Sequence, residues 1–208
     1  MAHPPARQTP TRQTPTPALR RPRRRRLTNP PAERNPLVNT PNLTALIGPP
    51  GAGKTTLRTA YPDALVVSLD DNRRALSWCG CANNQDDRLR AFAVQLAHTI
   101  AHHALAHGRD VLWDATNAHP ADRAALLLLA AEVGATTTAR LVLPPLETVL
   151  HRNRQRSNEQ CACGHSPRVP DQVVRAMHTT ITHDLPALPR EGWTRIKLPP
   201  TTTSSTTA

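Results

Sequence analysis

The segment from Leu46 to Thr56, LIGPPGAGKTT, restricts the fold of this chain more than any other stretch. Residues 48–55 match G-x-x-x-x-G-K-[ST], the pattern of a phosphate-binding loop, or P-loop. Glycines let such a backbone curl until successive N–H groups point at an anion. An apolar run at residues 43–47 precedes the loop, and a helix-compatible run at residues 55–60 follows it. A strand, this loop and a helix in that order predict a nucleotide-binding α/β domain.

The side chains of the P-loop predict how a nucleoside triphosphate is held. Lys54 brings a positive charge to the β- and γ-phosphates, and the hydroxyl of Thr55 ligates Mg²⁺. The helix that follows directs the positive end of its dipole at the same phosphates. We therefore expect ATP and Mg²⁺ as ligands of this loop. The predicted nucleotide contacts here are Gly48, Pro49, Pro50, Gly51, Ala52, Gly53, Lys54, Thr55 and Thr56.

Most of the positive charge of the chain lies near its N-terminus. The net charge is +11, but residues 1–36 alone hold nine Arg and one Glu. Residues 1–40 are rich in Pro and poor in apolar side chains, so we expect a disordered tail. This tail is either an arm that contacts nucleic-acid phosphates or a solvated extension without function. The Thr/Ser-rich residues 201–208 are also expected to be disordered. This leaves residues 41–200 as one P-loop domain.

Composition also bears on the cellular location. No apolar run approaches the length of a membrane-spanning helix, and the N-terminus lacks the apolar core of a signal peptide. We therefore expect no membrane partner. Four cysteines in such a chain indicate a reducing compartment, so the predicted location is cytoplasmic. The oligomeric state stays open.

Strand and helix patterns alternate between the two tails. This alternation predicts a parallel sheet with helices on both faces. A polar, basic loop after residue 155 is expected to form a lid. The predicted fold is an α/β P-loop NTPase with a five-stranded, mostly parallel sheet. Strands are expected at residues 43–47, 64–69, 110–114, 137–143 and 194–198, and helices at 55–60, 72–77, 87–107, 120–133, 146–155 and 170–185.

Carboxylates follow two of the predicted strands, at the edge where doubly wound sheets bind ligands. Asp70 follows the second strand, and Arg73 lies one helical turn later on the same side. The carboxylate can accept a proton from an attacking hydroxyl, and the guanidinium can bind an acceptor phosphate. Asp114 follows the third strand, where P-loop proteins place the Asp that orders Mg²⁺, although contact with the acceptor is an alternative. A capping Asp and a surface Arg are the alternative for Asp70 and Arg73.

Three arginines occupy alternate positions where the helix at residues 146–155 runs into the lid. Arg152 and Arg156 are four residues apart and share a helix face, whereas Arg154 does not. We expect Arg152 and Arg156 to reach the nucleotide and Arg154 to be solvated. A lid Arg can neutralise charge that develops on a transferred phosphoryl group. A wholly solvated basic face is the alternative.

The four cysteines form two C-x-C pairs. Cys79 and Cys81 lie in the loop after Asp70, and Cys161 and Cys163 lie in the lid. Both loops are expected to border the acceptor side, where four thiolates could hold a tetrahedral Zn²⁺ and connect lid to loop. C-x-x-C is the more usual chelating spacing, so free thiols and disulfides stay open as alternatives. The three Trp are too few and too scattered for a base-stacking platform, and core packing is expected.

Together these segments resemble the P-loop kinases of the bacteriophage-type polynucleotide 5′-kinase family, whose small actinobacterial relatives are often labelled only as ATPases. The resemblance covers residues 43–198 and rests on GPPGAGKTT, DDNR at 70–73, DATN at 114–117, RNRQR at 152–156 and RVP at 168–170. It implies that Asp70 is the general base on a 5′-hydroxyl, Arg73 holds the acceptor phosphate and Arg156 is the lid Arg. Lys54 and Thr55 would serve ATP and Mg²⁺.

The predicted function is therefore an ATP-dependent phosphotransferase that moves the γ-phosphate of Mg·ATP to a hydroxyl, with a nucleic-acid 5′-hydroxyl as the expected acceptor. Catalysis would rest on positioning and charge neutralisation. One alternative is a kinase of small molecules or nucleotide sugars, of toxin or resistance type. Another is a nucleic-acid-binding ATPase without transfer activity. The choice between RNA and DNA stays open.

Overall fold

The computed structural model describes residues 40–82 and 86–199. The two predicted tails lie outside the described residues, apart from Thr40, and their disorder stays a prediction. Within the described residues, no helix has both the length and the apolar character needed to span a bilayer.

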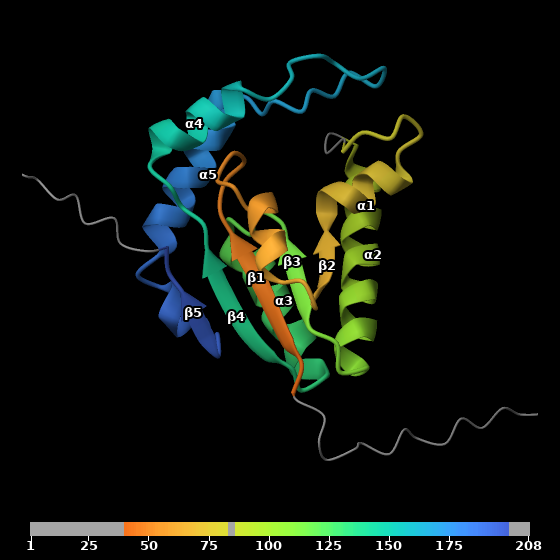
Figure 1. The fold of residues 1–208 in the computed structure, drawn as a ribbon, viewed down its shortest axis with the longest axis vertical. Helices are drawn as coiled ribbons and strands as arrows, with labels where there is room; N and C mark the ends of the chain where they lie inside the picture. Colours follow the sequence, from red (N-terminus) through yellow and green to blue (C-terminus); the bar gives the residue numbers. More distant parts are fainter. Residues whose placement is uncertain (1–39, 83–85, 200–208) are drawn as a thin grey trace, which may run out of the picture. The chain divides into compact units, whose positions relative to one another are not determined.

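In the described part of the chain, five strands form one parallel sheet in the order β2-β3-β1-β4-β5 (Figure 1). The chain leaves β1 for β2 at the sheet edge, returns through β3 and then crosses to β4 on the other side of β1. This change of direction creates a switch point beside the carboxyl end of β1, where doubly wound sheets bind ligands. The strands are β1 (Asn42–Ile47), β2 (Leu65–Ser68), β3 (Val111–Asp114), β4 (Thr136–Leu141) and β5 (Arg195–Lys197).

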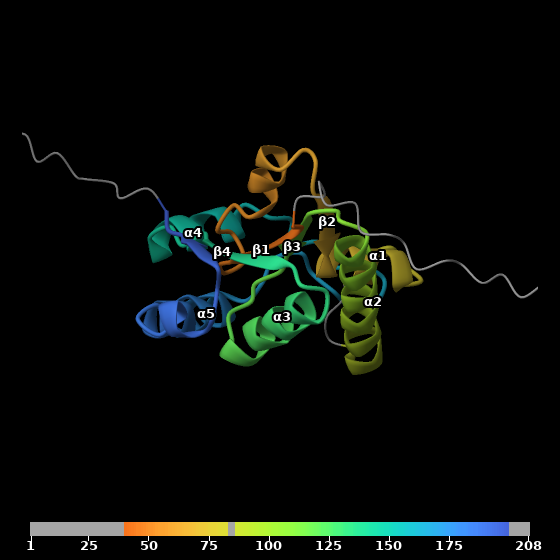
Figure 2. The ribbon, with the colours of Figure 1, turned by 90° about the horizontal axis from the view of Figure 1, so that it is seen from below.

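Helices cover both faces of the sheet, as predicted. Figure 2 shows α3 and α5 on one face, with η1 and α4 on the other. The helices are η1 (Thr55–Ala60), α1 (Leu69–Leu76), α2 (Asp87–Ala106), α3 (Pro120–Glu132), α4 (Leu146–Arg154), α5 (Asp171–Asp184) and η2 (Leu188–Arg190).

The helix after the P-loop has 3₁₀ geometry and six residues. Pro62 disfavours a helical backbone at the preceding residue, and Tyr61 has φ −131°, so the helix ends at Ala60. A single short 3₁₀ helix aligns fewer peptide dipoles than a long α-helix. Phosphate binding therefore depends more on the loop N–H groups and on Lys54 than the sequence pattern suggested.

The helix that carries Asp70 starts three residues earlier than expected. Ser68 caps α1, since its Oγ accepts a hydrogen bond from the Asp71 amide at 3.2 Å. Asp70 therefore lies in the first turn of α1 rather than at the end of a strand. The register still places this turn beside β3, because Ser68 pairs with Asp114 at the carboxyl edge of the sheet.

The main core lies between the sheet and helices α2, α3 and α5. Alternate residues of β1 face this core, as expected for a strand with period two: Leu43, Ala45 and Ile47. Trp113 and Trp193 are buried in it, as predicted, and the Trp113 ring packs edge-on against His98. The prediction was wrong for Trp78, which is 80% exposed. Trp78 directly follows Ser77, the C-cap of α1, and so lies in the loop after that helix rather than in a core-facing element.

Candidate functional site

The P-loop packs between the end of β4 and helix α4. A Cβ atom on Gly48 would overlap the carbonyl oxygen of Val142, and one on Gly51 would lie 2.5 Å from the carbonyl oxygen of Val149. Gly51 also has φ +86°, which side-chain-bearing residues rarely adopt. Glycine is therefore required at both positions, and the loop is fixed against its neighbours rather than freely mobile.

Lys54 bends back across the P-loop. Its Nζ donates hydrogen bonds to the carbonyl oxygens of Gly48 at 2.7 Å and Pro49 at 3.0 Å. Burial lowers the pKa of Lys54 to about 8, although the carboxylates of Asp114 and Asp70 favour the charged form. Arg156 lowers the pKa further. Three residues that the sequence assigned to the site, Asp70, Asp114 and Arg156, therefore act electrostatically on the Lys54 ammonium group.

Asp114 is buried at the end of β3 and is engaged by an arginine that the sequence analysis had given no role. Nε of Arg58 donates to Oδ2 of Asp114 at 2.7 Å, and NH1 of Arg58 lies 2.8 Å from Asp71. Thr55 is exposed at the start of η1. A hydroxyl and a carboxylate are oxygen donors of the type that Mg²⁺ prefers, so these residues fit the ion. An ion ligated by Asp114 would share that carboxylate with Arg58.

Asp70 and Arg73 form an ion pair within α1. NH1 of Arg73 lies 2.5 Å from Oδ1 of Asp70, as the spacing of three residues allows. The Asp70 side chain is 63% exposed, whereas that of Arg73 is only 12% exposed. The described residues offer Nε of Arg73 no hydrogen-bond partner, although it is buried. A reacting group can therefore reach the carboxylate of Asp70. The mostly buried Arg73 pairs with this carboxylate and keeps one N–H group, at Nε, without a partner among the described residues.

The three arginines at and after the end of α4 have different surroundings, and contact of Arg152 and Arg156 with a nucleotide stays a prediction. NH1 of Arg152 lies 3.4 Å from the carbonyl oxygen of Ala52, over the P-loop. Arg156, which follows the helix, acts electrostatically on Lys54. Arg154 turns away and pairs with Asp171 at the start of α5, at 2.6 Å, while half of its side chain stays exposed.

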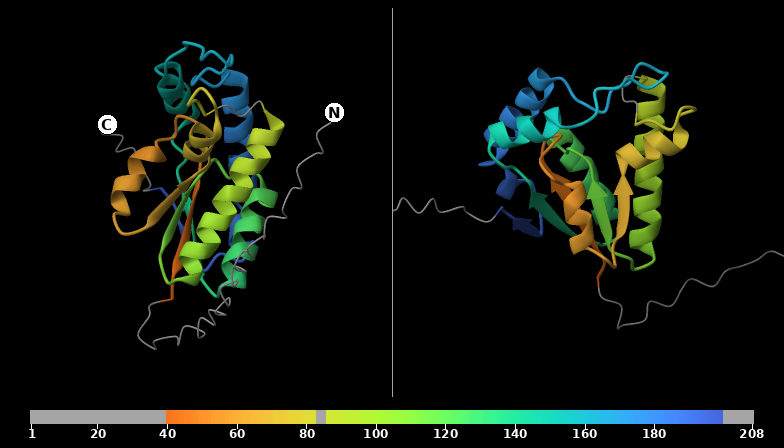
Figure 3. Two further views of the ribbon diagram at one scale, coloured as in Figure 1. Left: turned by 90° about the vertical axis from the view of Figure 1, so that its right-hand side faces the viewer. Right: turned by 45° about the horizontal axis from the view of Figure 1, so that its top comes forward.

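Residues 155–170, here called the lid, connect α4 with α5. The lid extends from these helices across the carboxyl ends of the strands toward the loop that follows α1 (Figures 1 and 3). Burial lowers the pKa of His165 in the lid. Three charged side chains of α1 also affect this pKa: Asp70 raises it, and Arg73 and Arg74 lower it. The lid therefore reaches the same helix that carries the exposed carboxylate.

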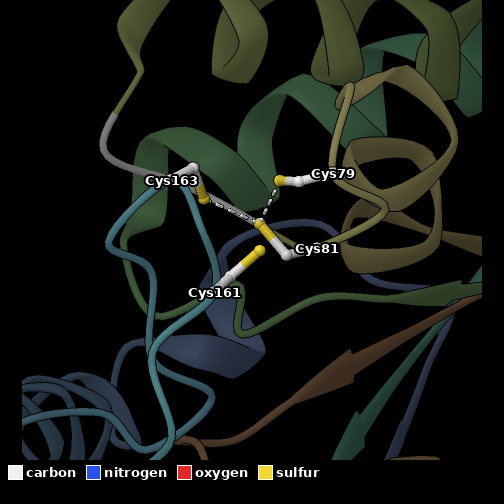
Figure 4. A group of neighbouring side chains, drawn as sticks. All are labelled: Cys79, Cys81, Cys161 and Cys163. Carbon is white, nitrogen blue, oxygen red and sulfur yellow. Dashed lines mark hydrogen bonds between the residues drawn. The ribbon is translucent and has the colours of Figure 1, made fainter.

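The four cysteines meet where the lid contacts the loop after α1 (Figure 4). Their sulfur atoms all lie within 4.8 Å of one another. The Sγ atoms of Cys79 and Cys81 are 3.3 Å apart, and those of Cys81 and Cys163 are 3.1 Å apart. Hydrogen bonds from the backbone and then the thiol of Cys81 lower the pKa of Cys79 to about 6. The two C-x-C pairs thus form one sulfur cluster, completed by Cys161.

A family model described as an AAA domain matches residues 43–183, well over half of the chain. The chain belongs to this AAA-domain family. Comparison with curated proteins gave no significant match.

Solved structures share the fold of this AAA domain. A chain of the Pnkp1/Rnl/Hen1 RNA repair complex aligns with a TM-score of 0.60 and 18% identity, over 72% of this chain and 46% of that one. A putative kinase from Chloroflexus aurantiacus J-10-fl gives 0.57 and 18%, over 77% and 88%. The AvrRxo1-ORF1:-ORF2 complex with ATP gives 0.55 and 17%, over 73% and 50%. The domain spans less than half of the RNA-repair chain, and it shares with these chains an α/β P-loop kinase-like fold.

Two buried side chains of the AAA domain hold the base of the P-loop, and the sequence analysis assigned neither. Asn117 adopts φ +45° and donates from Nδ2 to the carbonyl oxygen of Leu46 at 2.6 Å. Arg123 of α3 is 1% exposed and donates to the carbonyl oxygens of Asn117 and Ala118. Its remaining donors pair with Glu191, which is 68 residues away in the chain. No local pattern signals such a partner.

Asn153 anchors the far end of the lid. It is fully buried in α4, and its amide exchanges hydrogen bonds with the backbone of Val169, at 2.7 Å and 3.3 Å. The backbone of Asn153 also borders Gly51. The amide side chain of Asn153 therefore holds the end of the lid to α4, and the backbone of the same residue packs against the P-loop.

Proposed function

We propose that this AAA domain transfers the γ-phosphate of Mg·ATP to a hydroxyl group of an acceptor. The observation that carries the proposal is the convergence of Asp70, Asp114 and Arg156 on the Lys54 ammonium group. A phosphate-binding cation, a metal-binding carboxylate, an exposed carboxylate and a lid cation are the parts that phosphoryl transfer needs. The fold shared with P-loop kinases supports the same reaction class.

Each step of the reaction can be assigned to a side chain of this chain. Thr55 and Asp114 would hold Mg²⁺, which neutralises charge on the β- and γ-phosphates when bound. Asp70 accepts the proton of the acceptor hydroxyl while the hydroxyl oxygen bonds to the γ-phosphorus. The bond from the γ-phosphorus to the bridging oxygen breaks, and ADP leaves. Lys54 and Arg156 neutralise the charge on the transferred group, and Arg152 steadies the loop beneath it.

A nucleic-acid 5′-hydroxyl is the acceptor that we favour. Trp78, at the end of the helix that carries Asp70, presents an exposed aromatic ring on which a base can stack. Arg73, next to Asp70, suits the phosphate that lies beside a terminal hydroxyl. The predicted N-terminal arm would add sequence-independent affinity, and reduced cysteines fit a cytoplasmic location.

A small hydroxyl-bearing acceptor, such as a nucleotide sugar, is the second candidate. The lid contacts the loop after α1 through the cysteine cluster, so it closes part of the acceptor side. A closed lid favours a small acceptor over a polymer. An ATPase without transfer activity is the third candidate, and it would release inorganic phosphate without labelling any acceptor.

The decisive test is a label-transfer assay. The full chain is incubated with γ-labelled Mg·ATP and 5′-hydroxyl oligonucleotides of RNA or DNA, or with a pool of small metabolites. We expect label on the oligonucleotide 5′ end and none with the Lys54→Met variant, which loses the phosphate-binding charge. Label only on small molecules would select the second candidate. Release of inorganic phosphate without transfer would refute the proposal.

We also expect the affinity for Mg·ATP to fall as the pH rises above 8. Free Lys54 loses its proton there, because burial has lowered its pKa to about 8. The polyphosphate favours the protonated form, so binding at higher pH requires proton uptake and weakens by up to about tenfold per pH unit. Below pH 8 Lys54 is already charged and the affinity should level off.

Calorimetric titration across this range measures the slope. The matched control is Lys54→Arg, whose guanidinium stays charged throughout. It should bind more weakly but with a flat profile above pH 8. An equal slope in this variant would show that another group titrates.

A further inference from the structure

The cysteine cluster joins two segments that are far apart in the chain. Cys81 and Cys163 are 82 residues apart in sequence, yet their sulfurs are in contact. Among residues 40–82 and 86–199, this is the one group of three or more His, Cys, Asp or Glu side chains whose donor atoms converge as a metal ion requires. All four cysteines are partly exposed, so they do not belong to the apolar core.

The spacing of the sulfurs matches tetrahedral zinc. Four thiolates at Zn–S distances of about 2.3 Å lie about 3.8 Å from one another. The measured separations bracket this value: two are 3.1 Å and 3.3 Å, and none exceeds 4.8 Å. Shifts of about 1 Å or less would complete the tetrahedron, which side-chain rotation can supply.

The backbone forms each half of the site in advance. Side chains two residues apart on an extended strand start about 7 Å apart, whereas the sulfurs of a zinc site lie about 3.8 Å apart, so a turn brings such a pair together more readily than a strand does. Here Gly80 has φ +70° and its amide donates to the carbonyl oxygen of Ser77, so the first pair lies in a tight turn. In the lid, the Cys161 amide donates to the His165 carbonyl oxygen, and Gly164 has φ +81°. These turns explain how C-x-C spacing can chelate.

Neither alternative explains four convergent sulfurs. A disulfide joins two sulfurs at about 2.05 Å and needs no third or fourth thiol beside it. Unliganded thiols gain little from clustering at a partly exposed position. A single zinc ion accounts for all four residues and for their placement across two loops.

We propose that Cys79, Cys81, Cys161 and Cys163 bind one Zn²⁺ as thiolates, and that this ion fastens the lid to the loop after α1. The ion would hold the lid over Asp70 and limit the movement of Arg156, which precedes Cys161 by five residues. The statement that this ion lies on the acceptor side, near Asp70, rests on the proposed function. The metal site itself does not depend on it.

Metal content tests the site directly. The full chain, purified without chelator, is expected to carry about one zinc ion per molecule by plasma mass spectrometry. Exchange with Co²⁺ should produce the visible and thiolate charge-transfer bands of a tetrahedral sulfur site. The double variant Cys161→Ser/Cys163→Ser should lose both signals, and Cys79→Ser should weaken metal retention. The control Ala162→Ser, which changes the exposed residue between two ligands, should keep them.

Trypsin cleavage within the lid tests the fastening. Arg156 and Arg168 are exposed or partly exposed cleavage sites in the lid. We expect cleavage there to be about tenfold faster in the double Ser variant, or after chelation, than in the zinc-loaded chain, because local opening is no longer restrained. Equal cleavage rates would overturn the fastening.

Four titratable thiols without stoichiometric metal, or two disulfides, would overturn the zinc site. None of these readouts requires phosphoryl transfer, so a failed kinase assay would leave them intact. A chain that transfers phosphate but holds no zinc would refute this inference alone.

Discussion

Replacing Asp70 with Asn is expected to lower kcat for phosphoryl transfer by about 10²–10⁴-fold. The amide keeps the size of the carboxylate but cannot take the proton of the attacking hydroxyl. Because Asp70 is exposed in the first turn of α1 and lies outside the P-loop, the KM for ATP should change by less than about threefold. Steady-state kinetics with the acceptor identified by label transfer provide both numbers.

The substitution also breaks the ion pair with Arg73, so a matched control is needed. Asp87 at the start of α2 pairs with Arg90 at the same spacing of three residues, at 2.9 Å. Asp87→Asn removes a pair of the same spacing whose Arg is more exposed than Arg73, and it should leave kcat within about twofold of the parent. Normal kcat in Asp70→Asn would exclude Asp70 as the base. A rise in the KM for ATP at unchanged kcat would instead place Asp70 in nucleotide binding.

Replacing Arg123 with Met is expected to reduce the free energy of unfolding by about 3 kcal/mol. The buried guanidinium pairs with Glu191 and lies 3.5 Å from Asp184. Its removal leaves Glu191 without a guanidinium partner and Asp184 with His183 alone, and it takes a donor from the carbonyl oxygens of Asn117 and Ala118. Methionine fills a similar volume, so the loss should come from the polar network rather than from a cavity.

Urea unfolding followed by circular dichroism measures this change. The control is Arg109→Met at an exposed position, which should alter the free energy of unfolding by less than about 0.5 kcal/mol. Adding Glu191→Gln to Arg123→Met should recover part of the loss, since one unpaired carboxylate is removed. If Arg123→Met behaved like Arg109→Met, the network would be dispensable for folding. The variant should also bind ATP more weakly, because Asn117 supports the strand end that leads into the P-loop.

The periodic features of the chain were predictable. Parallel strands buried on both faces appear as apolar runs, and Gly108 and Gly134, both with positive φ, directly follow the C-caps of α2 and α3, so these positions followed from local pattern. Boundaries were less certain where one side chain decides them, as at Ser68, which starts α1 before Asp70. The 3₁₀ geometry of η1 was not predictable from its six residues, although Pro62 marks where the helix ends.

The candidate site divides in the same way. The P-loop, the exposed carboxylate and the α4 arginines could be chosen from motif spacing, because each acts within one turn or loop. Arg58, Arg123 and Asn153 could not, because their partners come from other elements and charged or amide residues are usually solvated. Trp78 was expected in the core because Trp is highly buried on average, but it lies in the loop after α1 and is 80% exposed.

The sequence by itself determined the order of strands and helices, the P-loop and the pairing of cysteines by two, since all of these are local. Only the tertiary structure decided that β1 lies between β3 and β4, that Arg58 engages Asp114, and that the two cysteine pairs meet. The physical reason is that each of these contacts joins different elements: strands pair within the sheet, η1 meets the end of β3, and the lid meets the loop after α1. Such long-range contacts follow from packing of the whole domain, which no short segment encodes.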